Sequence, residues 1–169
     1  MSGIGDEEER KKLVEAFSSV VRPEILEALQ SPDFNRVVNS FREAKLNFVI
    51  LCIDGTVPEE IGRSIGLVAD TTRRFGWDVE GMFSNLMVLI DGAPMPTTSE
   101  RGARTQLVAA LRLEQGPKIK MLHGTRNAAW GRYGSETGRS THGMILPDFI
   151  ALVAKLSALP NGAVEELAE

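Results

Sequence analysis

The chain lacks the features that mark secreted, membrane-spanning or nucleic-acid-binding proteins. Its single cysteine, Cys52, excludes an intramolecular disulfide and lies in an apolar run, which predicts a buried side chain. No apolar run is long enough to span a bilayer, and the polar, acidic N-terminus is unlike a secretory signal. The net charge of −4 offers no basic excess for nucleic acid. We therefore expect a cytoplasmic protein with no membrane span and no nucleic-acid partner.

What the chain does contain is ordinary for a globular domain, with 43% hydrophobic and 25% charged residues in 169 positions. The first part of the chain has helical spacing of apolar residues and a break at Ser31-Pro32-Asp33. A further helical segment is predicted from Val37, Val38, Phe41 and Ala44. The sequence therefore predicts a helical lead-in over residues 1–46 and a main domain over residues 47–169.

The main domain alternates strand and helix patterns. The run at 47–54 is continuously apolar, which is typical of a central strand buried on both faces. The elements predicted after it are a helix at 58–75, a hairpin at 77–82 and 85–90, a helix at 101–114, a strand at 118–123 and a helix at 146–159. The segment 124–143 is a loose hairpin or a mobile loop. This β-α-β-β-α-β order predicts an α+β, ferredoxin-like sheet with helices on one face.

Five segments, taken in order, resemble the catalytic domains of class III adenylate and guanylate cyclases. They are FSSVVRPEILEAL (17–29), NFVILCIDGTV (47–57), RFGWDVEGMFSNLMVLIDGAP (74–94), KIKMLHGTRNAAWGRYG (118–134) and HGMILPDFIALVAKL (142–156). The resemblance covers roughly residues 13–158 and implies a nucleotide cyclase-type fold. It also implies a homodimer, because that family builds its sites at a dimer interface.

The resemblance further implies where the catalytic residues of a cyclase would lie. Two Asp residues on neighbouring strands hold the metal ions in that family, and they match Asp54 and the neutral Asn85 here. An Asn and an Arg of a late helix match Ala151 and Lys155, and a base-selecting Lys matches Gly81. A degenerate active site follows, with Asp54 as a weak metal candidate. Independently of the resemblance, an Asp at a strand end is often a turn residue.

Other polar residues add to the candidate site. Arg126 and Arg132 lie in the glycine-rich segment, where guanidinium groups can bind an anion or simply be solvated on a surface hairpin. His123 is expected to make structural hydrogen bonds, since no third ligand has zinc-site spacing to it. The candidate residues of a vestigial ligand-binding cleft are Asp54, Asn85, Lys155, Arg126 and Arg132.

Three functions fit these residues. The first is a non-catalytic, dimeric cyclase-like module for binding, interaction or regulation in signalling, with no cofactor and with a nucleotide, another small ligand or a protein as partner. The second is a divergent nucleotidyl cyclase or other phosphoryl-transfer enzyme, in which Asp54 shares Mg²⁺ or Mn²⁺ with carboxylates such as Asp91 or Asp78. The third is a small-ligand sensor that uses the former nucleotide cleft.

Overall fold

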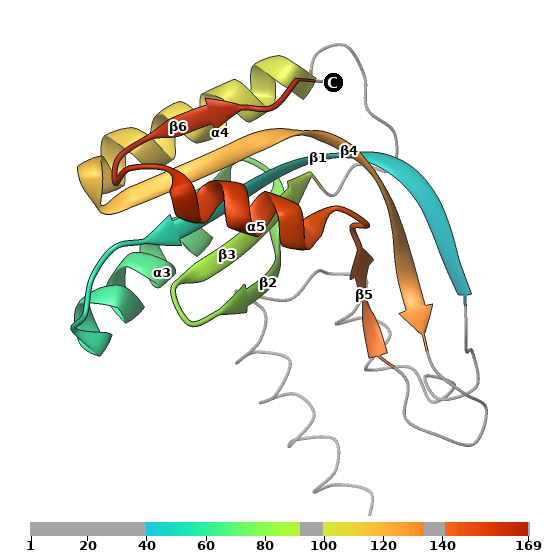
Figure 1. Ribbon diagram of the computed structural model, residues 1–169, viewed down its shortest axis with the longest axis horizontal. Helices are drawn as coiled ribbons and strands as arrows, with labels where there is room; N and C mark the ends of the chain where they lie inside the picture. The colour runs from blue at the N-terminus through green and yellow to red at the C-terminus, as the bar shows by residue number, and fades with distance from the viewer. Residues whose placement is uncertain (1–39, 92–99, 134–140, 169) are drawn as a thin grey trace, which may run out of the picture.

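The computed structural model describes residues 40–91, 100–133 and 141–168 (Figure 1). Its elements are β1 (Ser40–Ile53), α3 (Pro58–Arg74), β2 (Trp77–Phe83), β3 (Leu86–Asp91), α4 (Glu100–Gln115), the 3-10 turn Gly116–Lys118, β4 (Ile119–Tyr133), β5 (Thr141–Ile145), α5 (Phe149–Ala158) and β6 (Val164–Glu166). The order β-α-β-β-α-β from β1 to β4 confirms the predicted α+β, ferredoxin-like arrangement.

The sheet has the strand order β2-β3-β1-β4-β5, with β6 pairing with β4 outside this path. All neighbours are antiparallel except β6, which runs parallel to β4. β1 pairs with β4 along its whole length, from Ser40 opposite Arg132 to Ile53 opposite Ile119. The sheet is therefore built around two long central strands.

One predicted element of the lead-in is wrong. The helical segment expected around Phe41 and Ala44 lies in β1, which begins at Ser40. Pairing with β4 overrides the local helical spacing there, because β-structure depends on cross-strand partners more than on intrinsic preference. Residues 1–39 lie outside the described part of the chain, so the division at residue 46 stays a prediction.

The two faces of the sheet carry separate apolar cores. Alternate residues of β1 point to opposite faces, so Val49 and Leu51 join the core under α3 and α4, while Phe48 and Ile50 join the core under α5. The expected layer of helices on one face is formed by α3 and α4. Figure 1 shows α5 on the opposite side of the sheet. The apolar run of β1 is therefore buried on both faces, which explains why it is continuous.

The glycine-rich segment after His123 is a hairpin in the parts that are described. β4 continues to Tyr133, and β5 returns antiparallel to it, from Tyr133 opposite Thr141 to Ala129 opposite Ile145. Residues 134–140, which connect the two strands, lie outside the description. Across the described ranges, every helix is too short or too polar to cross a bilayer.

Candidate functional site

Asp54 and Asn85 lie together at one edge of the sheet. Asp54 directly follows β1, and its backbone N–H donates to the carbonyl of Lys118 at 2.6 Å. Asn85 lies in the turn between β2 and β3, after Ser84, whose φ of 56° is unusual for a non-glycine residue. The Asn85 side-chain amide donates to the Ile53 carbonyl at 2.8 Å, and the Ile53 N–H donates to the Asn85 carbonyl at 2.9 Å. The two positions matched to the cyclase metal ligands are therefore neighbours.

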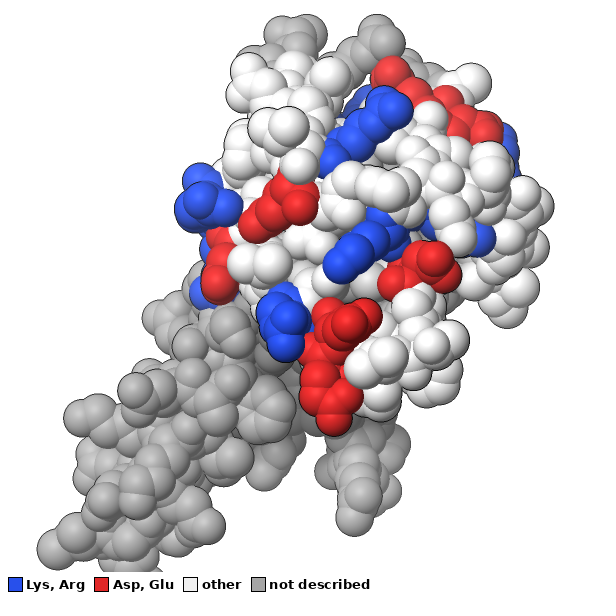
Figure 2. Space-filling view, turned by 90° about the vertical axis from the view of Figure 1, so that its left-hand side faces the viewer, with Lys and Arg blue, Asp and Glu red and all other residues white. Residues whose placement is uncertain are grey.

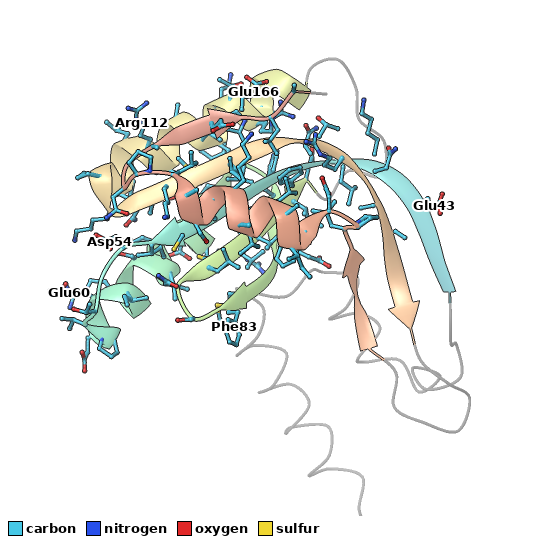
Figure 3. The ribbon with its side chains drawn as sticks, viewed as in Figure 1. Glu43, Asp54, Glu60, Phe83, Arg112 and Glu166 are labelled. Carbon is cyan, nitrogen blue, oxygen red and sulfur yellow. The ribbon has the colours of Figure 1, made fainter. Side chains whose placement is uncertain are left out.

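Only one of these two neighbours carries a charge. The side chain of Asp54 is exposed at the end of β1, as Figure 3 shows. Within the described ranges, no three His, Cys, Asp or Glu side chains are grouped so that they could hold a metal ion. A divalent cation prefers several carboxylate or carbonyl oxygens, so a single exposed carboxylate binds it weakly.

The carboxylates proposed as partners for Asp54 lie elsewhere. Asp78 and Asp91 belong to the end of the hairpin that pairs near Phe48, since Ile90 is opposite both Asp78 and Phe48. Phe48 precedes Asp54 by six residues along β1, which is about 20 Å in a strand. Two metal ions shared between carboxylates sit about 4 Å apart, so neither Asp78 nor Asp91 can complete a site with Asp54.

Cys52 and Lys120 complete this edge of the sheet. Cys52 is half-buried, which is less than the buried side chain predicted, and burial raises the pKa of its thiol above the usual value. The nearby ammonium of Lys120 lowers that pKa and the carboxylate of Asp54 raises it, with smaller effects than burial. Lys120 also donates to the carbonyls of Ser157 and Leu159, at 3.0 and 3.1 Å, and so satisfies the C-terminal end of α5.

The described side chains around this edge do not form a basic patch that could bind a polyphosphate. Figure 2 faces the end of the molecule that carries α3 and the end of β1, and acidic and basic side chains are interspersed on it. Lys155 of α5 is half-exposed and pairs with Glu165 at 2.5 Å. It therefore has a carboxylate partner of its own, and Ala151, one turn before it, is exposed without any polar side-chain group.

The arginines expected in the same cleft lie far from Asp54. Arg126 pairs with Asp148 at 3.2 Å and donates to the Ala168 carbonyl at 3.1 Å. In the sheet it is opposite Leu46, eight residues before Asp54 and about 26 Å away along the strand. Arg132 lies farther along β4, opposite Ser40, and its side chain is outside the description. The structure thus brings Asp54 and Asn85 together and separates both arginines from them.

An apolar groove between the β2–β3 hairpin and α5 was not predicted from the sequence. We call it the hairpin groove. It encloses about 370 Å³ and is lined by Gly81, Met82, Phe83, Leu86, Val88, Phe149, Ile150 and Val153. Phe83 and Ile150 are 82% and 84% exposed. Large apolar side chains that are this exposed and lie around one groove are typical of surfaces that contact another molecule.

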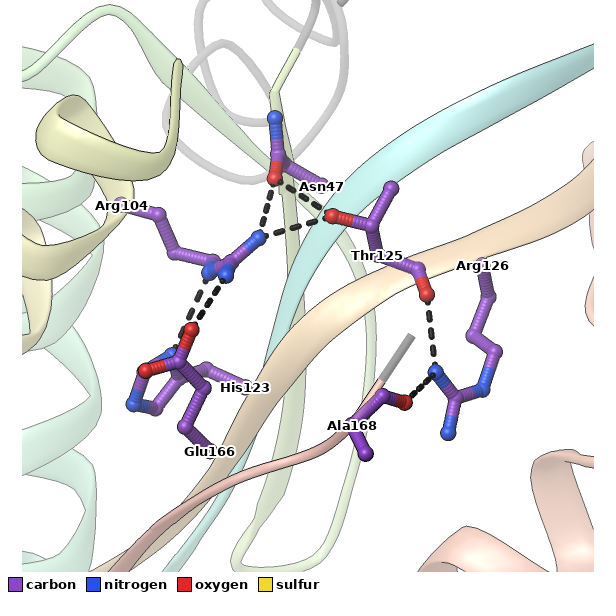
Figure 4. A network of polar contacts seen from close by, with 7 residues as sticks. All are labelled: Asn47, Arg104, His123, Thr125, Arg126, Glu166 and Ala168. Atoms are coloured by element: carbon purple, nitrogen blue, oxygen red, sulfur yellow. Dashed lines mark hydrogen bonds and ion pairs between the residues drawn. The ribbon is translucent and has the colours of Figure 1, made fainter. Parts of the chain in front are cut away.

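A buried polar network around Arg104 was also not predicted from the sequence (Figure 4). Arg104 of α4 is 4% exposed. Its Nε donates to Nδ1 of His123 at 3.2 Å, its Nη1 donates to Asn47 and to Thr125, and its Nη2 pairs with Glu166 at 3.1 Å. We call these five residues the Arg104 cluster. It connects α4, β1, β4 and β6, and it gives His123 a hydrogen-bonding role of the kind expected for it.

The sequence did contain one signal for this cluster. Arg104, Leu107, Val108 and Leu111 follow the i, i+3, i+4, i+7 spacing of a buried helix face, so Arg104 lies on the inward stripe of α4. A charged residue on such a stripe needs polar partners in the interior.

Comparison with known proteins identifies the fold of the chain. No family model and no curated protein matches the sequence. A bacterial light-regulated adenylyl cyclase matches with a TM-score of 0.69 and 11% identity over 96% of this chain, which spans 53% of that protein. The adenylyl cyclase CyaB from P. aeruginosa matches with a TM-score of 0.62 and 14% identity, covering 75% of this chain and 78% of that one.

The guanylyl cyclase Cya2 matches with a TM-score of 0.59 and 15% identity, covering 74% of this chain and 75% of the other. At these identities the likeness concerns the fold. The chain has the fold of the class III adenylyl and guanylyl cyclase catalytic domains, as its five segments predicted.

Proposed function

We propose that this chain is a non-catalytic cyclase-like domain that acts as a dimeric interaction or regulatory module. The observation that carries the proposal is the pair of positions Asp54 and Asn85 at the end of β1. They are adjacent, as a two-metal site would require, but Asn85 is neutral and its amide group is engaged with the Ile53 carbonyl. The two matched positions are therefore neighbours, but together they supply only one carboxylate.

Nucleotide cyclisation would need charge stabilisation that these residues do not supply. Two metal ions neutralise the phosphates and activate the attacking hydroxyl, and positioned donors stabilise the charge that develops in the transition state. Asp54 alone offers one carboxylate. At the two helix positions where donors are expected, Ala151 has none and Lys155 is paired with Glu165. The loss therefore affects both the metal site and the transition-state donors.

The hairpin groove supports the dimeric part of the proposal. Phe83 projects from the hairpin and Ile150 from α5, on the two sides of one apolar groove. A surface with both a projecting side chain and a groove fits a second copy of itself, because a two-fold axis places each projection opposite the other copy's groove. The described groove contains no charged side chain, which favours an apolar contact over a nucleotide there.

Calorimetric titration of ATP and of GTP into the purified chain, with Mg²⁺ and with Mn²⁺, tests the catalytic part, together with an assay for cyclic nucleotide on the same samples. We expect neither product nor metal-dependent binding. Binding without product would instead favour a nucleotide sensor. Product that disappears in Asp54→Ala would overturn the proposal, and it would show that a cyclase can work with Asn85 in place of the second carboxylate.

A further inference from the structure

The short strand β6 is specified on both of its faces by the elements around it. Val164 packs against the core under α3 and α4, and the next residue on that face, Glu166, pairs with the buried Arg104 of α4. On the other face, Glu165 pairs with Lys155 of α5, and Leu167 is 8% exposed in the core under α5. Four consecutive residues thus have four matched environments, alternating as a strand requires.

The backbone of this segment is bound just as specifically. The Met121 N–H donates to the Ala163 carbonyl at 2.9 Å, and the Leu167 N–H donates to the His123 carbonyl at 2.8 Å. A Cβ added to Gly124 would lie 3.1 Å from the Cβ of Leu167, which is tighter than ordinary packing. Glycine at 124 therefore makes room for Leu167. The edge of β4 at Met121–His123, with Arg104 and Lys155 on its two sides, forms what we call the strand slot.

The charges of the strand slot select an acidic strand. Among the described residues, Glu166 is the one carboxylate partner of Arg104. The side chain of Arg104 is 5% exposed. A buried guanidinium without a carboxylate is costly, because its neutral acceptors do not replace the lost ion pair. An extended segment with an acidic residue at the position of Glu166 and apolar residues at 164 and 167 therefore matches the slot.

We propose that the strand slot is a sequence-specific strand-binding site that accepts the Val164–Leu167 segment from a second copy of this chain as well as from its own. Every copy carries both the slot and the matching segment, so exchange between two copies is reciprocal and closed. This is an interface separate from the hairpin groove, and it does not depend on the function proposed above.

The connection between α5 and β6 provides the hinge for such an exchange. Residues 159–163 link the two elements, and Gly162 has a φ of 79° and packs against Pro117. In the structure this turn returns the chain to its own slot. Five residues extended would instead reach about 17 Å, which carries β6 away from its own β4. Shortening a hinge loop prevents the return and favours exchange between copies.

Deletion of residues 161 and 162 tests the proposal. The deletion is made in the full chain carrying Phe83→Asp, so that association through the hairpin groove is suppressed, and the molar mass is measured by light scattering. We expect a dimer, which an excess of a peptide with the sequence of residues 160–168 converts to a monomer. Adding Glu166→Lys should abolish the dimer, whereas the matched change Glu165→Gln, which removes only the exposed pair with Lys155, should leave it.

A folded monomer after the deletion overturns the proposal, and so does a dimer that survives Glu166→Lys. Where the deletion variant does not fold, peptide binding to the full chain with Phe83→Asp and Leu167→Ala gives the answer by fluorescence anisotropy. The peptide of residues 160–168 should bind at least about tenfold more tightly than the same peptide with Glu166→Lys, because only the former pairs with Arg104. Equal binding of the two peptides overturns the proposal.

Discussion

Asn85 and Ile53 bind each other reciprocally at the end of β1. The side-chain amide of Asn85 donates to the Ile53 carbonyl at 2.8 Å, and the Ile53 N–H donates to the Asn85 carbonyl at 2.9 Å. An aspartate at position 85 would place a carboxylate oxygen where the amide N–H now lies, next to that carbonyl. The neutral residue therefore stabilises the sheet edge at the position that the resemblance to cyclases matches to the second metal-binding Asp.

The first prediction concerns this exchange of stability for metal binding. Asn85→Ala should lower the free energy of unfolding by about 1 kcal/mol, because one partly buried hydrogen bond is lost. Asn85→Asp should be destabilised at least as much without metal, and Mn²⁺ in excess of its dissociation constant should restore about 1–3 kcal/mol. Thermal unfolding with and without Mn²⁺ measures both effects.

The control for this prediction is the pair of proteins that lack a second carboxylate. The unmodified chain and Asn85→Ala should unfold at the same temperature with and without Mn²⁺. If Mn²⁺ stabilises the unmodified chain as much as Asn85→Asp, then Asp54 has other metal-binding partners and the degenerate-site interpretation is wrong.

The second prediction compares two ion pairs that differ in burial. Arg104→Met should cost about 3 kcal/mol of stability, because Glu166 loses its buried ion-pair partner, and His123 and Thr125 lose the hydrogen bonds that Arg104 donates to them. Lys155→Met removes an exposed pair with Glu165 and should cost less than about 1 kcal/mol. Urea unfolding of both variants gives the comparison. Equal losses would mean that the Arg104 cluster is far more hydrated than its burial indicates.

The fold could be predicted from local patterns because each pattern agrees with the sheet. The apolar run of β1 from Asn47 is short and ends at Gly55, the hairpin has a turn near Ser84, and the helix before Gln115 has apolar residues at helical spacing. The start of β1 could not be predicted in this way. Phe41 and Ala44 have helical spacing, and only the distant partner strand β4 makes their backbone extended.

Only the part of the candidate site that lies at strand ends could be predicted, because the end of a strand is visible in the local sequence. Asp54 and Asn85 each follow or precede a strand, and antiparallel pairing of β1 with β3 brings these ends together. The distance of Arg126 from Asp54 depends on the register of β4, which local spacing does not determine. The Arg104 cluster joins residues up to 119 positions apart, so its partners could not be identified from α4 alone.

The third prediction concerns self-association through the hairpin groove. Phe83→Asp should weaken dimerisation at least about tenfold, because it places a charge in an apolar contact. Leu113→Asp is the matched control. Leu113 is 89% exposed, but it belongs to α4, which covers the opposite face of the sheet from α5. Analytical ultracentrifugation over a concentration series measures both. Equal weakening, or a monomeric unmodified chain, would contradict dimerisation through this groove.

The fourth prediction uses the Cys52 thiol to report on the Asp54 edge. Burial raises the pKa of this thiol, and Asp54 raises it further while Lys120 lowers it. At a fixed pH below that pKa, Asp54→Asn should therefore increase the rate of alkylation by iodoacetamide, since the thiolate becomes more populated. Lys120→Met should decrease the rate. Mass spectrometry of the labelled chain gives both rates.

The same pKa shift has a consequence for stability. A thiol whose pKa is raised by folding favours the folded state fully below its ordinary pKa, and this contribution is lost as the pH rises through the raised value. Denaturant unfolding should therefore show stability that falls with alkaline pH less steeply in Cys52→Ala than in the unmodified chain. Identical slopes would mean that the thiol is as hydrated in the folded state as in the unfolded one, and Cys52 would then be no probe of the edge that Asp54 and Asn85 form.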